Sequence, residues 1–280
     1  MHRKLEGTSL GLIAGSGRLP FEVAEAAHER GLRVAVVAIE DNTDPAIESQ
    51  ADGPFTWVAA GELGRLIEFL KGAGVVEAVL AGAISKREIL RDPSRLRPDA
   101  RAMSLLSRLE GGGDDAILRA VADEIESEGI RVVPSTAHLA DRMTREGPLV
   151  AGLEGTRYRA DLELGLRVAR ALGEHDVGQT VVVKEGAVVA VEALEGTDAT
   201  IRRAGEVAGQ GAVAVKVAKP TQDLRFDVPV IGPETLEIAR SARLAAIGLE
   251  AGATLVLEPS RTFALAKAAK IPIVGLGTSR

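Results

Sequence analysis

Alternating cations and acids in residues 216–227 form the stretch of this sequence best suited to chemistry. Lys216 lies near the end of an apolar Val/Ala run, and Lys219, Asp223, Arg225 and Asp227 follow it. Lysine and arginine neutralise phosphate oxygens, whereas aspartate holds Mg²⁺ together with several water molecules. The stretch therefore indicates a site for a phosphate diester and a hard cation, with a surface ladder of salt bridges as the alternative.

A second acidic group follows another Val/Ala run. Glu192 interrupts that run, and Glu195, Gly196, Thr197 and Asp198 come directly after it. A charge inside an apolar strand needs a partner, so Glu192 indicates a functional role. A capped helix start with solvated acids is the simpler alternative.

The first apolar strand leads into a turn and a helix start that a phosphate could use, because unpaired amides and the helix dipole both favour an anion. Pro20 stands where the dinucleotide fingerprint has its third glycine, although Glu40 and Asp41 follow the second strand at about the ribose-binding distance. The pattern predicts either a nucleotide site or only a tight turn. The residues concerned are Gly15, Ser16, Gly17, Leu19 and Pro20.

Two adjacent acids, Asp114 and Asp115, follow three glycines at the start of a further predicted helix. Carboxylates at this position can cap the unpaired amides of the first turn without any functional role. The alternative is that they reach a metal ion or a sugar hydroxyl.

The elements that must position these residues alternate between strands and helices. In the first half, strands are predicted at 10–14, 33–39, 78–81 and 130–133, with helices at about 20–30, 63–71 and 114–129. In the second half, helices are predicted at 161–172, from 198, and at 234–244, with a last one before 271. Strands are predicted there at 180–183, 188–193, 213–217, 228–231, 254–257 and 271–274. This alternation predicts an α/β fold with two α/β domains, the first Rossmann-like and doubly wound.

Periodicity lapses between residues 134 and 155, where Pro, Gly, Thr and Glu accumulate. We therefore expect an N-terminal Rossmann-like domain at 1–135, a linker at 136–155 and a C-terminal α/β catalytic domain at 156–280. A chain of 280 residues suits two domains of this size.

Composition excludes several classes of function. With no cysteine, the chain has neither disulfides nor thiolate chemistry, and four histidines are too few for a His-rich dinuclear phosphoesterase site. A net charge of -6 and 2% aromatic residues argue against a nucleic-acid partner. Neither a membrane-spanning run nor a signal-peptide core is evident, so we expect a cytoplasmic protein.

Six segments, taken in order, resemble the LpxI-type UDP-2,3-diacylglucosamine pyrophosphatases. They are 11–20 (GLIAGSGRLP), 113–119 (GDDAILR), 176–179 (DVGQ), 191–198 (VEALEGTD), 219–223 (KPTQD) and 225–229 (RFDVP). The resemblance spans nearly the whole chain, and its C-terminal blocks are more specific than a single glycine turn. Residues 82–88 (GAISKRE) depart from it, because they lack the family's Arg-Pro pair.

The resemblance implies hydrolysis of UDP-2,3-diacylglucosamine to UMP and 2,3-diacylglucosamine 1-phosphate in lipid A biosynthesis. It also implies a homodimer, a divalent cation such as Mg²⁺, and possible peripheral contact with the inner membrane. Asp227 matches an aspartate that the family needs for turnover. We hypothesise that Asp227, with Asp223 or Glu192, positions the cation and an attacking water, and that Asp227 and Asp223 bind the metal; direct proton abstraction by Asp227 is the competing role.

The residues expected to bind the substrate fall in both halves of the chain. They are Gly15, Ser16, Gly17, Leu19, Pro20, Gly82, Asp114, Asp115, Gln179, Glu195, Gly196, Thr197, Asp198, Lys216, Lys219, Gln222 and Arg225. Two other functions fit parts of the sequence: a nicotinamide-dependent oxidoreductase using the first strand–helix–strand unit, and a non-catalytic protein that binds a nucleotide sugar or lipid.

Overall fold

A computed structural model gives the structure of the chain. It describes residues 9–84, 92–109, 114–220, 223, 225–226 and 228–277, with the backbone alone at residues 93, 114 and 115. These residues form two compact units. The N-terminal unit contains the described residues up to Ala140 together with those of 223–227, and the C-terminal unit contains those of 141–222 and 228–280.

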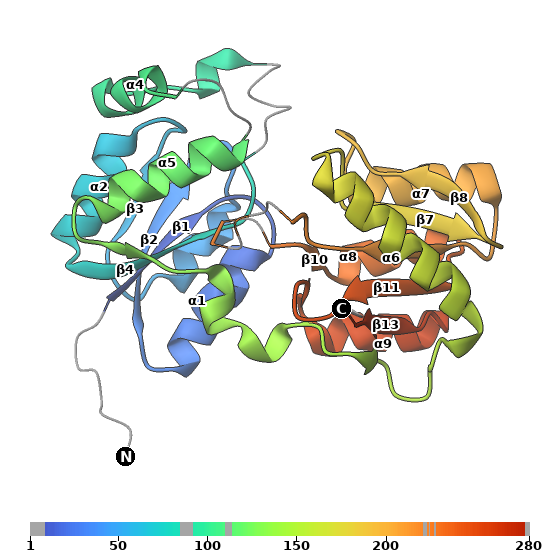
Figure 1. The fold of residues 1–280 in the computed structure, drawn as a ribbon. Coiled ribbons are helices and arrows are strands. Elements are labelled where there is room, and N and C mark those ends of the chain that lie inside the picture. Colours follow the sequence, from blue (N-terminus) through green and yellow to red (C-terminus); the bar gives the residue numbers. More distant parts are fainter. Residues whose placement is uncertain are drawn as a thin grey trace. The chain divides into compact units, whose positions relative to one another are not determined.

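The N-terminal unit is built on a parallel five-stranded sheet with the strand order β3-β2-β1-β4-β5 (Figure 1). The central strand β1 pairs with β2 on one side and β4 on the other, so that Leu12 faces both Val36 and Val79. This is the strand order of a doubly wound Rossmann-like fold. The strands are β1 (Ser9–Ala14), β2 (Arg33–Ile39), β3 (Phe55–Val58), β4 (Val75–Ala81) and β5 (Arg131–Val132).

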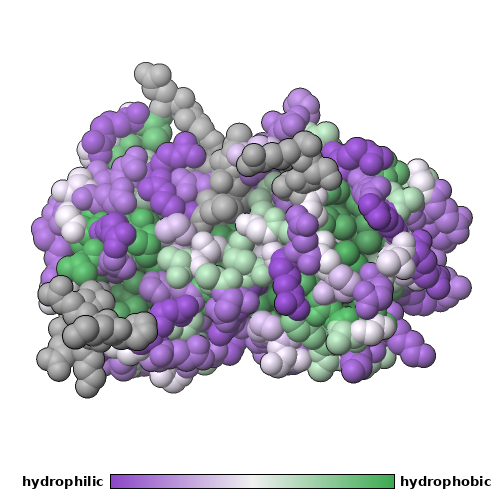
Figure 2. Space-filling view, turned by 60° about the horizontal axis from the view of Figure 1, so that its bottom comes forward, coloured by the Kyte–Doolittle hydropathy of each residue, from purple (hydrophilic) through white to green (hydrophobic). Residues whose placement is uncertain are grey.

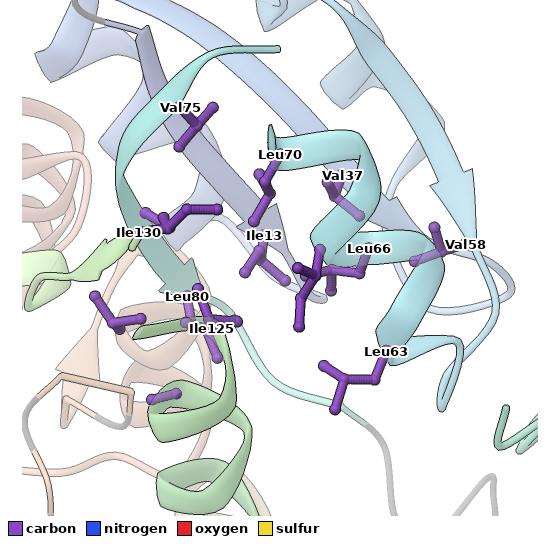
Figure 3. Close-up of a cluster of buried hydrophobic side chains, with 14 of the residues drawn as sticks. Ile13, Val37, Val58, Leu63, Leu66, Leu70, Val75, Leu80, Ile125 and Ile130 are labelled. Carbon is purple, nitrogen blue, oxygen red and sulfur yellow. The ribbon is translucent and has the colours of Figure 1, made fainter. Parts of the chain in front are cut away.

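Helices cover both faces of this sheet, which is why its strands are almost continuously apolar. One face packs against α2 and α5. Figure 3 shows Leu66 and Leu70 of α2 beside Ile13 of β1, and Ile125 of α5 beside Leu80 of β4. The helices are α1 (Leu19–Glu29), α2 (Leu63–Gly72), α4 (Ala100–Ser107) and α5 (Asp114–Glu126). The same core contains Phe226, which comes from far along the chain and is 6% exposed.

The C-terminal unit has a mixed six-stranded sheet with the order β6-β13-β11-β9-β7-β8. Strands β9, β11 and β13 run parallel, whereas β7 pairs antiparallel to both β9 and β8. The strands are β6 (Gly147–Pro148), β7 (Thr180–Lys184), β8 (Ala187–Val191), β9 (Val213–Lys216), β11 (Ala246–Glu250) and β13 (Ile273–Leu276); β10 (Val230–Ile231) and β12 (Leu255–Val256) form a separate pair.

Two apolar clusters lie on opposite faces of the larger sheet. One lies beneath α6 (Arg159–Glu174), and the other beneath α7 (Thr197–Ala208), α8 (Pro233–Ser241) and α9 (Pro259–Ala269). The resulting three layers bury most of the hydrophobic side chains. The surface drawn in Figure 2 is correspondingly dominated by hydrophilic residues, with hydrophobic patches between them.

The structure confirms the predicted α/β class with two α/β parts, the first Rossmann-like. Strands β3 and β11 and helix α4 are additions to the elements predicted from the sequence. Residues 136–155, expected as a linker, contain β6, which pairs antiparallel to β13.

Candidate active site

One end of the C-terminal sheet gathers most of the predicted polar residues of this unit. Strand β9 ends at Lys216, which pairs with Thr180 at the start of β7, and Glu192 directly follows β8. Helix α7 begins nearby at Thr197. Ligands of α/β sheets bind at the carboxyl ends of the parallel strands, and this end of the sheet is therefore the candidate site in the C-terminal unit.

Thr197 links the two buried charges at this end. Its hydroxyl donates to Glu192 Oε2 at 3.1 Å, and it accepts from Lys216 Nζ at 3.0 Å. Thr180 Oγ1 lies 3.1 Å from the same hydroxyl, and Lys216 also donates to the Val230 carbonyl at 2.9 Å. Glu192 is 6% and Lys216 8% exposed. The prediction that Glu192 meets a partner is therefore confirmed, and the partner is a hydroxyl bound to a lysine.

Close backbone approach explains the glycine in the 176–179 segment. A Cβ on Gly178 would overlap the carbonyl oxygen of Glu192, so only glycine allows this loop to lie against the end of β8. The next residue, Gln179, accepts from the Val217 amide at 2.9 Å through its backbone. Its side-chain oxygen is buried and has no hydrogen-bond partner among the described residues.

Four other predicted residues border this group. Glu195 accepts from Arg203 and from the Ala193 amide, and hydrogen bonds from its own backbone amide and from Arg203 lower the pKa of its carboxyl. Gly196 has a φ of 81°, so glycine permits the sharp entry into α7. Lys219 donates to Asp176 at 2.6 Å. Asp198 lies in the first turn of α7.

Asp223 and Arg225 belong to the N-terminal unit, where α5 supplies their neighbours. Arg225 grips the Asp223 carboxylate through Nε, at 3.0 Å from Oδ1, and through Nη2, at 2.8 Å from Oδ2. Arg119 Nε lies 3.7 Å from Oδ2, and Glu126 Oε2 lies 3.8 Å from Arg225 Nη1. The Arg225 guanidinium also stacks over the ring of Phe226, with its carbon 4.8 Å from the centroid.

The mutual hydrogen bonds of Asp223 and Arg225 shift the pKa of each group toward its charged form. Side-chain hydrogen bonds from Arg225 lower the pKa of the Asp223 carboxyl by more than partial burial raises it. The same hydrogen bonds raise the pKa of Arg225. Both side chains are therefore ionised at neutral pH.

Among the described residues, the donor set does not fit a metal ion held mainly by the protein. No group of three or more His, Asp or Glu side chains is placed to hold a cation in that part of the chain. Both oxygens of Asp223 already accept from Arg225. Asp227 and Gln222, predicted to bind metal and substrate, lie outside the described residues, as do the side chains of Asp114 and Asp115 at the start of α5.

The turn after β1 is fastened to the end of β4. Gly15 and Ser16 each donate a backbone amide, to the carbonyls of Ala81 and Ala83, both at 2.8 Å. A Cβ on Gly82, whose φ is 87°, would overlap the Ser16 carbonyl oxygen, so this contact explains the glycine at 82. The amides of Gly15 and Ser16 are thus both used within the fold.

Other residues of this region also have structural roles. Glu40, which would bind a ribose in the oxidoreductase interpretation, forms an ion pair with Arg97. Leu19 and Pro20 are buried in the first turn of α1. Gly17, with a φ of 90°, has open space around it. A nucleotide or substrate site at this turn stays a prediction.

The hypothesis that Asp223 and Glu192 act together stays a prediction, because the two residues belong to different units. Sequence reasoning missed Glu250, at the end of β11, which is 8% exposed and accepts from Arg170 at 2.8 Å and from the Ala218 amide at 2.9 Å. It fixes the chain as it leaves β9. An acid directly after the apolar run 244–249 would have revealed it, had that run been recognised as a strand.

Comparison with known proteins covers both halves of the chain. The model of the LpxI N-terminal domain matches residues 9–142, and that of the LpxI C-terminal domain matches residues 145–274. A relative from Caulobacter vibrioides, UDP-2,3-diacylglucosamine pyrophosphatase LpxI, is 36% identical in an alignment 278 residues long that covers 95% of this chain and 97% of the relative. This chain belongs to the LpxI family.

Solved structures add nothing to this assignment. The biotin carboxylase domain of a thermophilic 2-oxoglutarate carboxylase is 15% identical, with a TM-score of 0.25, and the match covers 64% of this chain and 35% of that domain's chain. The biotin carboxylase subunit of a pyruvate carboxylase is 12% identical, with a TM-score of 0.26, and the match covers 71% of this chain and 41% of the subunit. Asp223, Arg225 and Phe226 lie within the match to the LpxI C-terminal domain, but they pack with the N-terminal unit.

Proposed function

We propose that this chain hydrolyses the pyrophosphate bond of UDP-2,3-diacylglucosamine, releasing UMP and 2,3-diacylglucosamine 1-phosphate for lipid A biosynthesis. The similarity to the Caulobacter LpxI pyrophosphatase carries the proposal, because it spans 95% of this chain and 97% of the relative. The chemistry is the hydrolysis of a phosphoanhydride.

The described side chains support this reaction by their charge. Lys216 is a buried cation at the carboxyl end of β9, and Arg225 is a cation with an orientation fixed by Asp223. Cations held in place before the reaction stabilise the negative charge that develops on a diphosphate, because they need not reorganise. Lys216 and Arg225 are thus the proposed substrate-binding cations, and Asp227 is the proposed catalytic carboxylate.

A divalent cation such as Mg²⁺ is part of the proposal. Mg²⁺ commonly keeps several waters and binds through one or two carboxylates and the phosphates of a substrate. Such a cation would lower the charge of the diphosphate. The described residues offer it no ready site, so Asp227 and the substrate itself are its proposed ligands.

A homodimer, a cytoplasmic location and peripheral contact with the inner membrane complete the proposal. The substrate carries two acyl chains, which motivates the membrane contact. In the part of the chain that the structure describes, every helix is too short or too polar to cross a bilayer. Cross-linking tests the homodimer, and flotation with lipid vesicles tests the membrane contact.

The decisive experiment is incubation of the purified protein with UDP-2,3-diacylglucosamine and Mg²⁺, followed by chromatographic detection of UMP. UMP should appear with an equal amount of 2,3-diacylglucosamine 1-phosphate. Retention of the lipid without UMP would instead support a non-catalytic binding protein, and a shift of NADH fluorescence on mixing would support the oxidoreductase.

Removal of the cation tests the metal separately. Excess EDTA should abolish UMP release, and added Mg²⁺ should restore it, because chelation of a bound cation is reversible. Full activity in EDTA would contradict the metal proposal while leaving the hydrolase proposal intact.

A further inference from the structure

Asp223 is predicted from the sequence as a metal ligand, but its surroundings describe a different role. Its Oδ1 accepts from Arg225 twice, from the backbone amide at 3.1 Å and from Nε at 3.0 Å. Its Oδ2 accepts from Nη2 at 2.8 Å and lies 3.2 Å from Nε. A carboxylate has about four lone-pair sites, and Arg225 engages most of them.

The side of Arg225 that remains suits a phosphate group. Of five N–H donors on a guanidinium, the Asp223 fork uses the one on Nε and one on Nη2. The edge formed by Nη1 and Nη2 points away from this fork. Glu126 Oε2 forms an ion pair with Nη1 at 3.8 Å, which is longer than a hydrogen bond and leaves the N–H groups of this edge without a hydrogen bond to that carboxylate. Such an edge can bind two phosphate oxygens at once.

Phe226 fixes the guanidinium from a second direction. Its ring lies in the apolar core of the N-terminal unit, where it is 6% exposed, and Arg225 stacks over that ring at 4.8 Å. A fork on one edge and a ring on one face leave the arginine little freedom. The sequence Asp-x-Arg-Phe thus presents one guanidinium edge in a set orientation.

We propose that Asp223 is a positioning residue that holds Arg225 for the substrate diphosphate, rather than a ligand of the metal ion. This inference rests on the proposed function, because it assigns Arg225 to the phosphates of that substrate. It removes Asp223 from the metal site and leaves Asp227 as the other acidic residue in the sequence of residues 216–227.

A double-mutant cycle separates the two roles. Asp223→Ala should lower kcat/KM by about 10- to 100-fold, because a displaced binding group commonly costs this much. In an Arg225→Ala background the same substitution should change kcat/KM by less than about twofold, since Asp223 then has nothing to position. Multiplicative effects of the two substitutions would overturn the proposal.

Metal binding provides a readout that does not depend on turnover. Mn²⁺ titrated into the protein with UMP, and followed by water proton relaxation, should bind Asp223→Ala as tightly as the unmodified protein. A loss of Mn²⁺ affinity of about tenfold or more, as expected for a ligand or its close support, would make Asp223 a metal ligand and overturn the proposal.

Two further variants guard against misfolding and non-specific effects. Asp223→Asn retains the shape and one acceptor for Arg225, so it should retain more activity than Asp223→Ala. The Glu237–Arg240 pair on α8, joined at 2.6 Å on the exposed surface, is the matched control, and Glu237→Ala should leave kcat/KM unchanged.

Failure of this inference is distinguishable from failure of the proposed function. If the unmodified protein releases no UMP, the hydrolase proposal fails, and the same cycle is then measured on the affinity for UDP. Coupled losses of UDP affinity would still support positioning of Arg225 by Asp223, whereas independent losses would overturn it.

Discussion

Thr197 shows how much a single hydroxyl can hold together. It donates a hydrogen bond to the buried Glu192 carboxylate and accepts one from the buried Lys216 ammonium. The hydroxyl thus gives each of the two charges a hydrogen-bond partner. A charge buried without partners would cost several kcal/mol. The sequence indicated that Glu192 has a partner, but only the packing of α7 against β8 reveals which one.

Removal of that hydroxyl should therefore be costly. Thr197→Val preserves the shape of the side chain but leaves Glu192 and Lys216 without their shared partner, so we expect a loss of about 1 to 3 kcal/mol in the free energy of unfolding. Thr197→Ser restores the hydroxyl and should recover most of this loss. Denaturant titration of the two variants makes the comparison, and equal stability of Thr197→Val and the unmodified protein would contradict the role of the hydroxyl.

Asp227 is the residue on which the proposed chemistry most depends. Asp227→Ala should lower kcat by about 100-fold or more while leaving substrate affinity within about threefold, because a group needed only in the transition state affects turnover and not binding. Initial rates of UMP release and equilibrium binding of the substrate measure the two effects. Asp141→Ala, at an exposed position, is the control, and near-normal turnover of Asp227→Ala would refute the assignment.

The Asp223–Arg225 pair should also leave a mark on the pH dependence of stability. The pKa of Asp223 in the folded protein lies below its ordinary value of 3.8, so the pair stabilises the fold above pH 3.8. This contribution is lost as the pH falls below 3.8 through the folded value. Thermal midpoints of the unmodified protein and Asp223→Asn should differ at pH 7, and the difference should shrink as the pH is lowered below 3.8. A difference that does not shrink in acid would contradict the shift.

At the scale of the elements, the strand that sequence reasoning missed lies at the centre of the C-terminal sheet. Strand β11 contains Gly248, and glycine weakens strand patterns. The structure shows why glycine is there. A Cβ would lie 2.7 Å from Leu276 Cδ1 of β13 and 3.0 Å from Leu162 Cδ2 of α6, so both leucine side chains would have to shift to admit it.

Gly248→Ala should consequently destabilise the protein by about 1 to 3 kcal/mol through overpacking. Gly72, at the end of α2, has a negative φ and open space within 4 Å of the position that a Cβ would take, so Gly72→Ala should be neutral or slightly stabilising. Unfolding midpoints of the two variants test the difference. A Gly248→Ala variant as stable as the control would show that the neighbouring leucines move aside at no cost.

The remaining elements were predictable to different degrees for identifiable reasons. The buried strands β1, β2 and β9 were evident because both of their faces are covered and they are nearly pure Val, Ala, Ile and Leu. The short strand β3 escaped notice because Trp57 and most of its neighbours are only partly buried. In the site, the residues flanking β8 and β9 were named from sequence, but the bond network through Thr197 depends on tertiary packing that no local pattern encodes.

At the scale of the whole molecule, the order of the sequence and the order of the packing differ. Residues 223–226 follow β9 of the C-terminal unit, yet Phe226 lies among Ile125, Ile130 and other core residues of the N-terminal unit. A single boundary near residue 140 therefore separates the two family-model matches, but it does not separate the two packed units. No sequence pattern announces such a return of the chain.

Phe226→Ala should thus lower the stability of the N-terminal unit, although residue 226 lies in the C-terminal half of the sequence. Loss of a buried aromatic ring costs on the order of 3 kcal/mol, and the loss should appear as faster amide hydrogen exchange in α5 and β4. Exchange in α7, α8 and α9 should stay unchanged. Phe226→Leu, which refills most of the volume, is the matched variant and should recover part of the protection; a uniform increase across both units would contradict this assignment.

The placement of Phe226 also has a consequence for synthesis on the ribosome. Amino-terminal domains commonly fold while later parts of the chain are still being made. Here the first unit lacks one of its interior side chains until synthesis has proceeded from Ala140 to Phe226. The hydrophobic core of the nascent N-terminal unit is therefore incomplete during this interval. Phe226, in the same segment as the proposed catalytic carboxylate, completes that core.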